Sequence, residues 1–201
     1  MAKNIESRLI LRTILEVYIT LSYLTNKDDE TVWMQYRNYG YGQTKLAFLK
    51  NLKLDDLPNF LTLEMLEGIA NEDMWIEYQD IKLGNWSDKN LRKMAEEAGL
   101  KDTYDRYYDN LSGYVHGNWS AVRHSVFGVC LNPLHRFHRI PLPQRNFQLD
   151  SIPDAVKLVN QCLEKITILY PPFKFRFRIL PSDTADSDKS FIEEVGGESS
   201  D

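Results

Sequence analysis

The chain has 201 residues, of which 43% are hydrophobic and 26% are charged, and this composition excludes a disordered chain and a membrane-embedded one. The net charge of −5 comes from residues 182–201, which hold seven acidic residues and one basic residue, so the remaining body is nearly neutral. A nearly neutral body excludes a strong uniform field that would attract nucleic acid, and only a local basic patch stays open.

The two cysteines, Cys130 and Cys162, stand alone, without the spacing of a metal-binding motif. Isolated cysteines favour free thiols in a reducing compartment, with a disulfide between the two as the alternative. The amino terminus has no signal-peptide pattern, and the longest apolar run, residues 9–24, is short for a membrane span and contains Arg12 and Glu16. We therefore expect a cytoplasmic protein that does not cross a membrane.

The first three predicted elements are helices. Residues 4–25 carry apolar side chains at helical spacing on more than one face, which predicts a central helix. A second helix is expected over residues 29–52, with two glycines in residues 39–43 that predict a kink. A weaker helical pattern covers residues 61–79.

Three further helices follow at short intervals. Ser87 is the expected N-cap of the first, with Asn90 near its third position, and Gly99 is expected to end it. The second is expected over residues 101–116, where aromatic and aliphatic residues form an apolar stripe, and the third over residues 119–128.

The last third of the chain is more varied. Residues 129–152 contain three prolines and are expected to form an extended ordered loop before a final helix over about 153–169. Alternating charged and apolar residues over 171–180 predict a short strand or an arm. We therefore expect an all-α helical bundle as a single domain over 1–180, followed by a disordered acidic tail over 181–201.

Charged residues on the first helix form the first candidate site. Arg8, Arg12 and Glu16 are spaced by four and so share one helix face within the most apolar segment of the chain. Because a buried charge is costly unless it is paired, we expect an internal ion pair that fixes helix register, with an anion or phosphate site at Arg12 as the functional alternative.

A second candidate site lies on the helix over residues 101–116. Tyr108, Ser112 and His116 are four apart and share one face, and His116 directly precedes a glycine at the helix end. A histidine there is suited to general acid–base or ligand-binding roles, with Ser112 within reach. The leading interpretation is nevertheless a buried, hydrogen-bonded histidine that locks the turn, with the catalytic or ligand-binding role as the alternative.

The third candidate site is the loop sequence "NPLHRFHRIP". Its candidate binding residues are Asn132, His135, Arg136, His138 and Arg139. The leading interpretation is a loop pinned to the core by side-chain hydrogen bonds, and the functional alternative is a basic patch for phosphate or RNA. Neither HExxH nor a paired Cys/His motif is present, so we expect neither a metal nor a cofactor.

Four stretches together resemble a known family: "RLILRTILEVYITLSYL", "NLRKMAEEAGL", "YYDNLSGYVHG" and "CLNPLHRFHR". Over roughly residues 5–170 the chain is similar to a bacterial family of unknown function, numbered 5677, which has an early Arg…Glu helix and a later Ser-x-x-x-His helix end. This resemblance implies a helical fold and no particular chemistry.

A looser resemblance is to the HEPN superfamily of helical ribonucleases and nucleotide-binding domains, which cleave RNA without metal and commonly dimerise. Their motif is an arginine, four to six residues and a histidine near a helix end, which would be His116 here. The positions for the arginine hold Asp109, Asn110 and Leu111. An arginine from the first helix, Arg8 or Arg12, would then have to supply the charge.

Two hypotheses for function follow. The favoured one is a non-enzymatic interaction or sensor module, in a defence or regulatory system, that binds an unknown protein partner, because the chain lacks a strong catalytic motif. The alternative is a divergent HEPN-like, metal-independent ribonuclease or nucleotide- or RNA-binding domain centred on His116, with Ser112 and Arg12 as catalytic partners. The HEPN resemblance also implies a homodimer.

Overall fold

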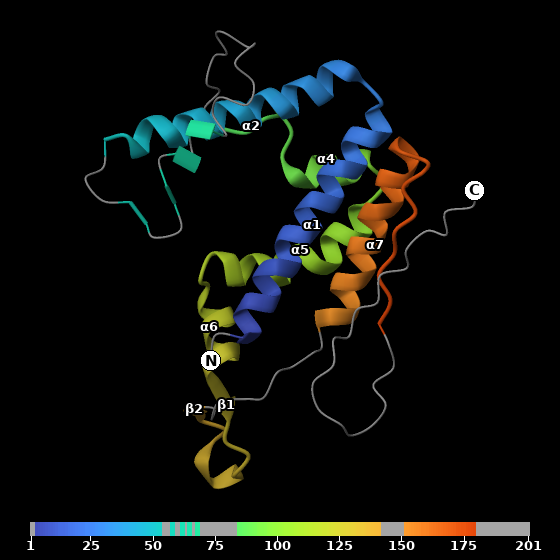
Figure 1. Ribbon diagram of the computed structural model, residues 1–201. Coiled ribbons are helices and arrows are strands. Elements are labelled where there is room, and N and C mark those ends of the chain that lie inside the picture. The colour runs from blue at the N-terminus through green and yellow to red at the C-terminus, as the bar shows by residue number, and fades with distance from the viewer. Residues whose placement is uncertain are drawn as a thin grey trace, which may run out of the picture. The chain divides into compact units, whose positions relative to one another are not determined.

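The structure, a computed structural model, describes three long stretches of the chain and four short ones: residues 3–53, 84–141 and 151–179, and residues 57–58, 61–62, 64–65 and 67–68. Most of the described residues are helical, which confirms the predicted all-α class (Figure 1). Most of the helix predicted over residues 61–79, and the acidic tail over 181–201, lie outside the described residues.

The chain divides into two compact units. One comprises residues 1–25 and 94–201, and the other comprises residues 26–93. The first unit holds most of helix α1 (Lys3–Lys27) and all of the following elements: α5 (Lys101–Val115), α6 (Trp119–Val126), β1 (Phe127–Val129), β2 (Arg139–Pro141) and α7 (Ile152–Leu169).

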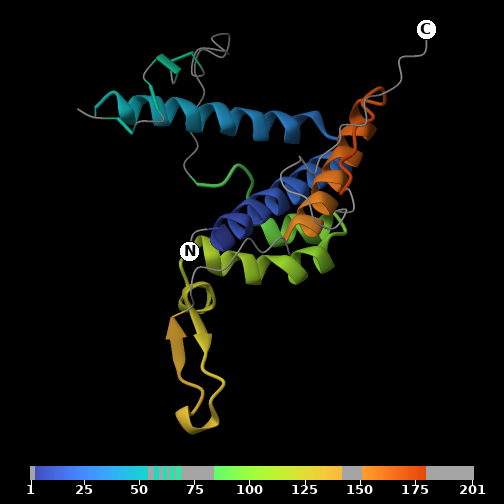
Figure 2. The ribbon, with the colours of Figure 1, turned by 60° about the horizontal axis from the view of Figure 1, so that its bottom comes forward.

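Helix α1 is the centre of the first unit, as its apolar residues predict. Leu15 and Ile19 have no exposed surface, and Leu24 is almost completely covered. Residues four apart lie on one helix face, so Leu15 and Ile19 form one stripe, whereas Leu24, five residues further, faces another side; α1 is therefore covered on more than one side. Both ribbon views show α1, α5 and α7 side by side (Figures 1 and 2). The core of this unit is therefore the space between these three helices.

The turn between α5 and α6 is compact. The backbone N–H of His116 donates to the Ser112 carbonyl at 3.1 Å, and that of Asn118 donates to the Gly113 carbonyl at 2.9 Å. Gly117 adopts a φ of 60°, in the left-handed region where glycine ends helices at little cost. This sequence-encoded stop places His116 at the C-cap of α5.

A β-hairpin follows α6 and was not predicted. Strand β1 pairs antiparallel with β2, with Gly128 opposite Ile140. The loop predicted over 129–152 is therefore wrong at Val129 and over residues 139–141, which are strand, and at Ile152, which starts α7. Residues 130–138 form the loop between the strands, and residues 142–150 lie outside the described part of the chain. The hairpin extends away from the helices of its unit in both views (Figures 1 and 2).

Helix α4 (Leu91–Glu97) begins later than its sequence signals predict. The Asn90 side chain, not Ser87, caps it by accepting a hydrogen bond from the Lys93 N–H at 2.9 Å. Ser87 instead accepts from the Lys89 N–H, two residues on, as serine does in turns. The helix ends as predicted, because Gly99 has a φ of 72°.

The segment after α7 is an arm and not a strand. The Asn160 amide donates to the Phe177 carbonyl and accepts from the Phe177 N–H, both at 2.8 Å. One side chain thus replaces the partner strand that the alternating sequence would need. This clamp holds the arm against α7 within the same unit.

The second unit contains α2 (Glu30–Asn51). Asp29 caps it by accepting from the Thr31 N–H at 2.8 Å. The helix runs without a break through Gly40 and Gly42, where the sequence predicts a kink. Among the described residues of both units, no helix combines the length and apolarity that crossing a membrane requires.

Candidate functional site

Helices α1 and α5 meet in an antiparallel seam that holds the first two candidate sites. The Arg12 guanidinium carbon lies 4.1 Å from the centre of the Tyr108 ring, and that of Arg8 lies 5.1 Å from the centre of the Tyr114 ring. The earlier arginine on α1 contacts the later tyrosine on α5, so the two helices run antiparallel. The α1–α5 seam, as we name it, is formed by these four residues and Glu16.

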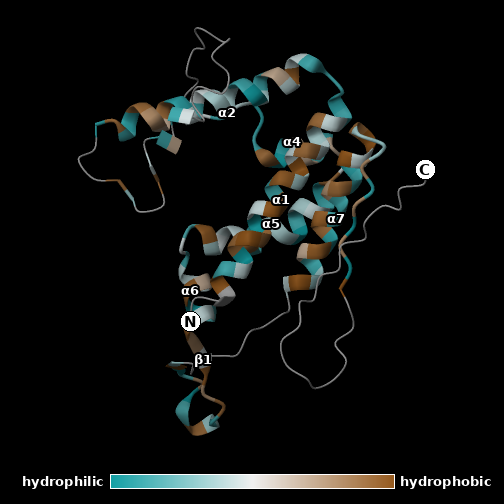
Figure 3. Cartoon of the chain, in the orientation of Figure 1, coloured by the Kyte–Doolittle hydropathy of each residue, from teal (hydrophilic) through white to brown (hydrophobic). Residues whose placement is uncertain are grey.

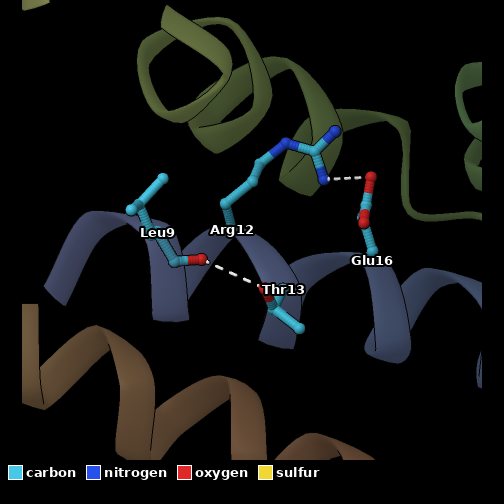
Figure 4. A network of polar contacts seen from close by, with 4 residues as sticks. All are labelled: Leu9, Arg12, Thr13 and Glu16. Atoms are coloured by element: carbon cyan, nitrogen blue, oxygen red, sulfur yellow. Dashed lines mark hydrogen bonds and ion pairs between the residues drawn. The ribbon is translucent and has the colours of Figure 1, made fainter. Parts of the chain in front are cut away.

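Arg12 is the charged centre of the α1–α5 seam. Only 6% of its surface is exposed, and its Nη1 lies 2.6 Å from Oε1 of Glu16, one turn along α1 (Figure 4). The internal ion pair expected from the sequence is present. The guanidinium of Arg12 also lies over the Tyr108 ring, and this contact stabilises a cation that is shielded from water. Within the described residues the Nε of Arg12 has no hydrogen-bond partner.

Two tyrosines on α5 extend the aromatic side of the seam. The rings of Tyr104 and Tyr108 stack with their centres 4.3 Å apart. Burial raises the pKa of the Tyr104 hydroxyl to about 12, with further contributions from Tyr108 and Asp109, and Arg12 opposes the rise. Tyr104 is therefore a neutral hydroxyl near neutral pH and not a proton acceptor.

His116 lies at the exposed end of α5, so the interpretation as a buried, hydrogen-bonded histidine is wrong. Ser112 is half-buried one turn earlier, and its carbonyl accepts the backbone N–H of His116. The two side chains form no hydrogen bond with each other. The chain reverses at Gly117 directly after His116, and residues 115–120 around this turn are all exposed.

The hairpin tip carries the third candidate site. Residues 131–141 are all exposed, so the loop is not pinned to the core. Its bonds are local: Asn132 accepts from the Leu134 N–H at 3.0 Å and caps a 3-10 turn, η1 (Pro133–His135). Arg136 and Phe137 have φ of 51° and 54°, a conformation that non-glycine residues seldom adopt.

Sequence reasoning missed one member of this tip. Cys130 follows β1, and its Sγ lies 3.5 Å from Nδ1 of His135. His138 completes the group, with its ring centre 5.4 Å from that of His135. Cys130 directly follows the first strand and lies opposite His138, which directly precedes the second strand. A predicted hairpin would have revealed this pairing, but the hairpin itself was not predicted.

The predicted site residues therefore fall into separate groups. Arg8, Arg12, Glu16 and Tyr108 belong to the α1–α5 seam, and Ser112 and His116 stand at the end of α5. The hairpin holds the rest: Asn132, His135, Arg136, His138 and Arg139. In both ribbon views the hairpin projects away from helices α1 and α5 (Figures 1 and 2).

Comparison with known proteins identifies one family. The family model that matches is described as a family of unknown function (DUF5677), and it matches residues 3–130, more than half of the chain. The matched residues run from α1 through β1 and include the α1–α5 seam and His116, ending at Cys130. Neither a curated protein nor a solved structure matches the chain.

Proposed function

The chain belongs to this family of unknown function, DUF5677, and from that premise we propose that it is a non-enzymatic interaction module that recognises a protein partner through its hairpin. The observation that carries the proposal is the apolar hairpin tip. Leu131 is 84% exposed and Leu134 is 88% exposed, and Phe137 stands beside them with more than half of its surface in water. Large apolar side chains gathered on one exposed element are typical of binding surfaces.

The charge of the hairpin indicates the chemistry of the partner. Residues 127–141 contain Arg136 and Arg139, two histidines and no acidic residue. Both arginines are exposed. A partner that fits would offer an apolar pocket for the leucines and carboxylates at its rim for the arginines. The hairpin is mixed in hydropathy, with apolar and polar residues side by side (Figure 3).

The energetics of the tip also support this role. Burying one leucine side chain contributes about 1.5–3 kcal/mol. Exposing Leu131 and Leu134 together therefore forgoes several kilocalories per mole that folding alone does not recover. A partner that covers both side chains would recover this free energy on binding. The hydrogen bonds within the tip reduce the ordering that binding requires.

The contacts of Arg12 support a structural role for the charged residues of the α1–α5 seam. Arg12 is engaged by Glu16 and by the Tyr108 ring, so its charge is already compensated. A buried cation held in this way fixes how α1 meets α5. In this account the seam makes the scaffold rigid, and the hairpin that it carries does the recognising.

A second candidate function, RNA binding or cleavage at His116, is favoured by one observation. His116 is exposed, and Arg8 stacks on Tyr114, which lies two residues before it. Arg8 therefore places a positive charge near the end of α5. The HEPN resemblance requires such a charge, and in this chain it would have to come from the first helix. The hydrogen bond that links this pair joins their backbones, and the Ser112 hydroxyl is not bonded to the His116 ring, which weakens the candidate.

The test of the two candidates begins with RNA. Purified chain is incubated with total cellular RNA without metal, and retention and cleavage are measured for the wild type, His116→Ala and Arg8→Ala, with His124→Ala as the control. His124 is also exposed, on α6. We expect neither retention nor cleavage by any of the four proteins. Cleavage that only His116→Ala and Arg8→Ala lose would replace our proposal with the second candidate.

A second experiment tests for a protein partner. A protein captured from extracts of the source cells with wild-type chain is purified and its binding remeasured in isolation. The variant Leu131→Gln/Leu134→Gln should lose this binding. The control is Ile10→Gln, which changes an apolar side chain on α1 that is 60% exposed. Equal binding by the double variant would contradict the proposal.

A further inference from the structure

We propose that Cys130, His135 and His138 form a binding site for a divalent transition metal ion, with Zn²⁺ as the ion that fits best. Each residue offers one ligand atom, and these atoms all lie within 4.8 Å of one another. The spacing of the three residues matches no standard metal-binding motif. Cys130 directly follows β1, His135 ends the 3-10 turn, and His138 directly precedes β2. The proposal goes beyond partner recognition and does not depend on it.

The distance between two of the ligand atoms already suits zinc. Zinc binds cysteine sulfur at about 2.3 Å and histidine nitrogen at about 2.0–2.1 Å with tetrahedral angles, which separates the two ligand atoms by about 3.5 Å. The Sγ of Cys130 and the Nδ1 of His135 lie 3.5 Å apart. A zinc ion would therefore reach both atoms at their present separation. Binding at Nδ1 leaves the ring hydrogen on Nε2, so the Asn132 amide, whose Nδ2 lies 3.4 Å from Nε2, would have to turn away.

His138 is oriented as a metal ligand should be. Its Nδ1 lies 3.1 Å from the His135 carbonyl oxygen, to which only a protonated nitrogen can donate. This bond leaves Nε2 with its lone pair unprotonated in the neutral ring. Histidines that bind metals commonly donate their other ring nitrogen to a carbonyl, which fixes the tautomer and the ring orientation.

The backbone of the hairpin holds the three residues together. The N–H of Cys130 donates to the His138 carbonyl at 2.9 Å, directly across the ladder. Between them the chain makes a tight reversal through Arg136 and Phe137, both with positive φ. A reversal that strains two non-glycine residues returns His138 to Cys130. Strain of this kind commonly marks functional positions.

The donor set selects the kind of ion. One thiol and two imidazoles favour Zn²⁺ and similar transition metals over Mg²⁺ and Ca²⁺, which prefer oxygen. Three protein ligands leave a fourth tetrahedral position for water or for a group from another molecule. Because Cys130 directly precedes Leu131 and His138 directly follows Phe137, a bound ion would also fix the apolar tip.

The test uses the untagged full chain, reduced and freed of metal with a chelator. Zinc is titrated against a coloured competing chelator, and Co²⁺ is added in a separate experiment to record its absorption. The variants are Cys130→Ser and His138→Ala. The matched control is His124→Ala, which removes a histidine that is exposed on α6 and outside the cluster. Circular dichroism checks that every variant keeps its helices.

The wild type and His124→Ala should bind one equivalent of zinc. Cys130→Ser and His138→Ala should bind it at least about tenfold more weakly. The thiolate-to-cobalt absorption should disappear in Cys130→Ser alone. Equal zinc affinity in all four proteins, or no binding by the wild type at micromolar zinc, would show that the contacts only order the turn. Since no partner is present, this result is independent of the proposed recognition function.

Discussion

Arg12 places a full positive charge at a buried position in the α1–α5 seam and is stabilised there by two different interactions. Glu16 supplies the opposite charge, and Tyr108 supplies an aromatic face that needs no hydrogen bond. The spacing of Arg12 and Glu16 revealed the ion pair in the sequence, because residues four apart on a helix are neighbours. Nothing in the sequence identified Tyr108 as the third partner, since that contact depends on how α5 crosses α1.

Neutralising Glu16 should destabilise the first unit. In Glu16→Gln the buried Arg12 charge loses its counter-charge while the shape of the side chain is kept. We expect the free energy of unfolding to fall by about 1 kcal/mol, less than for a fully buried pair, because the Glu16 side chain is half exposed. Urea unfolding measures the change. Glu164→Gln, at an exposed position in the interior of α7 and away from either helix end, is the control and should change little. An equal loss in both variants would contradict the role of the pair.

The two thiols should differ in reactivity. Cys162 is buried on α7, and burial raises the pKa of its thiol to about 11, so almost no thiolate is present at pH 8. In Cys130→Ala the remaining Cys162 should react with a thiol reagent at least about tenfold more slowly than in the unfolded chain. Rates measured in buffer and in denaturant test this. Similar rates in both would mean that the thiol is accessible.

At the scale of elements, helices were predictable and the hairpin was not. The apolar residues of α1, α5 and α7 recur at the helical period, and a period repeated over several turns is a strong signal. The hairpin has strands of only three residues. Its reversal uses positive φ at Arg136 and Phe137, where the sequence offers no glycine to indicate it. Cys130 could not be joined to the histidines without that hairpin.

The arm after α7 should depend on one side chain. Asn160→Ala removes both hydrogen bonds to Phe177, and no strand replaces them. We expect trypsin to cleave native protein after Lys174 and Arg178 several times faster in this variant, with the helices unchanged. Asn110→Ala is the control, because its side chain bonds only within α5. Unchanged cleavage would mean that the neighbouring aromatic residues hold the arm without the clamp.

At the scale of the whole molecule, the hydrophobic core and the apolar hairpin tip lie on different elements of the described chain. The buried apolar residues of the first unit gather on its helices, whereas the hairpin tip has no buried residue. Membership of DUF5677 was predictable from the order of the motifs along the chain. The sequence could not predict one functional site, because the residues that it singled out do not all meet in the structure. They lie in three places: the α1–α5 seam, the end of α5 and the hairpin.

Removing the tip should leave the fold intact. We expect a chain in which residues 131–137 are replaced by Asn-Gly, a favoured two-residue hairpin turn, to keep its melting temperature within about 2 °C. The physical reason is that none of the replaced side chains is buried. Thermal unfolding followed by circular dichroism measures this. A large loss of stability would show that the tip is part of the scaffold, contrary to our account.

The most direct measurement is the dissociation constant of the purified partner for the wild type, Leu131→Gln/Leu134→Gln and Ile10→Gln, by calorimetry. If the hairpin tip is the recognition element, the double variant should bind at least about tenfold more weakly, because two leucines leave the buried centre of the interface. Ile10→Gln should bind as the wild type does. Equal affinities for all three proteins would contradict the proposal and move the binding surface elsewhere on the chain.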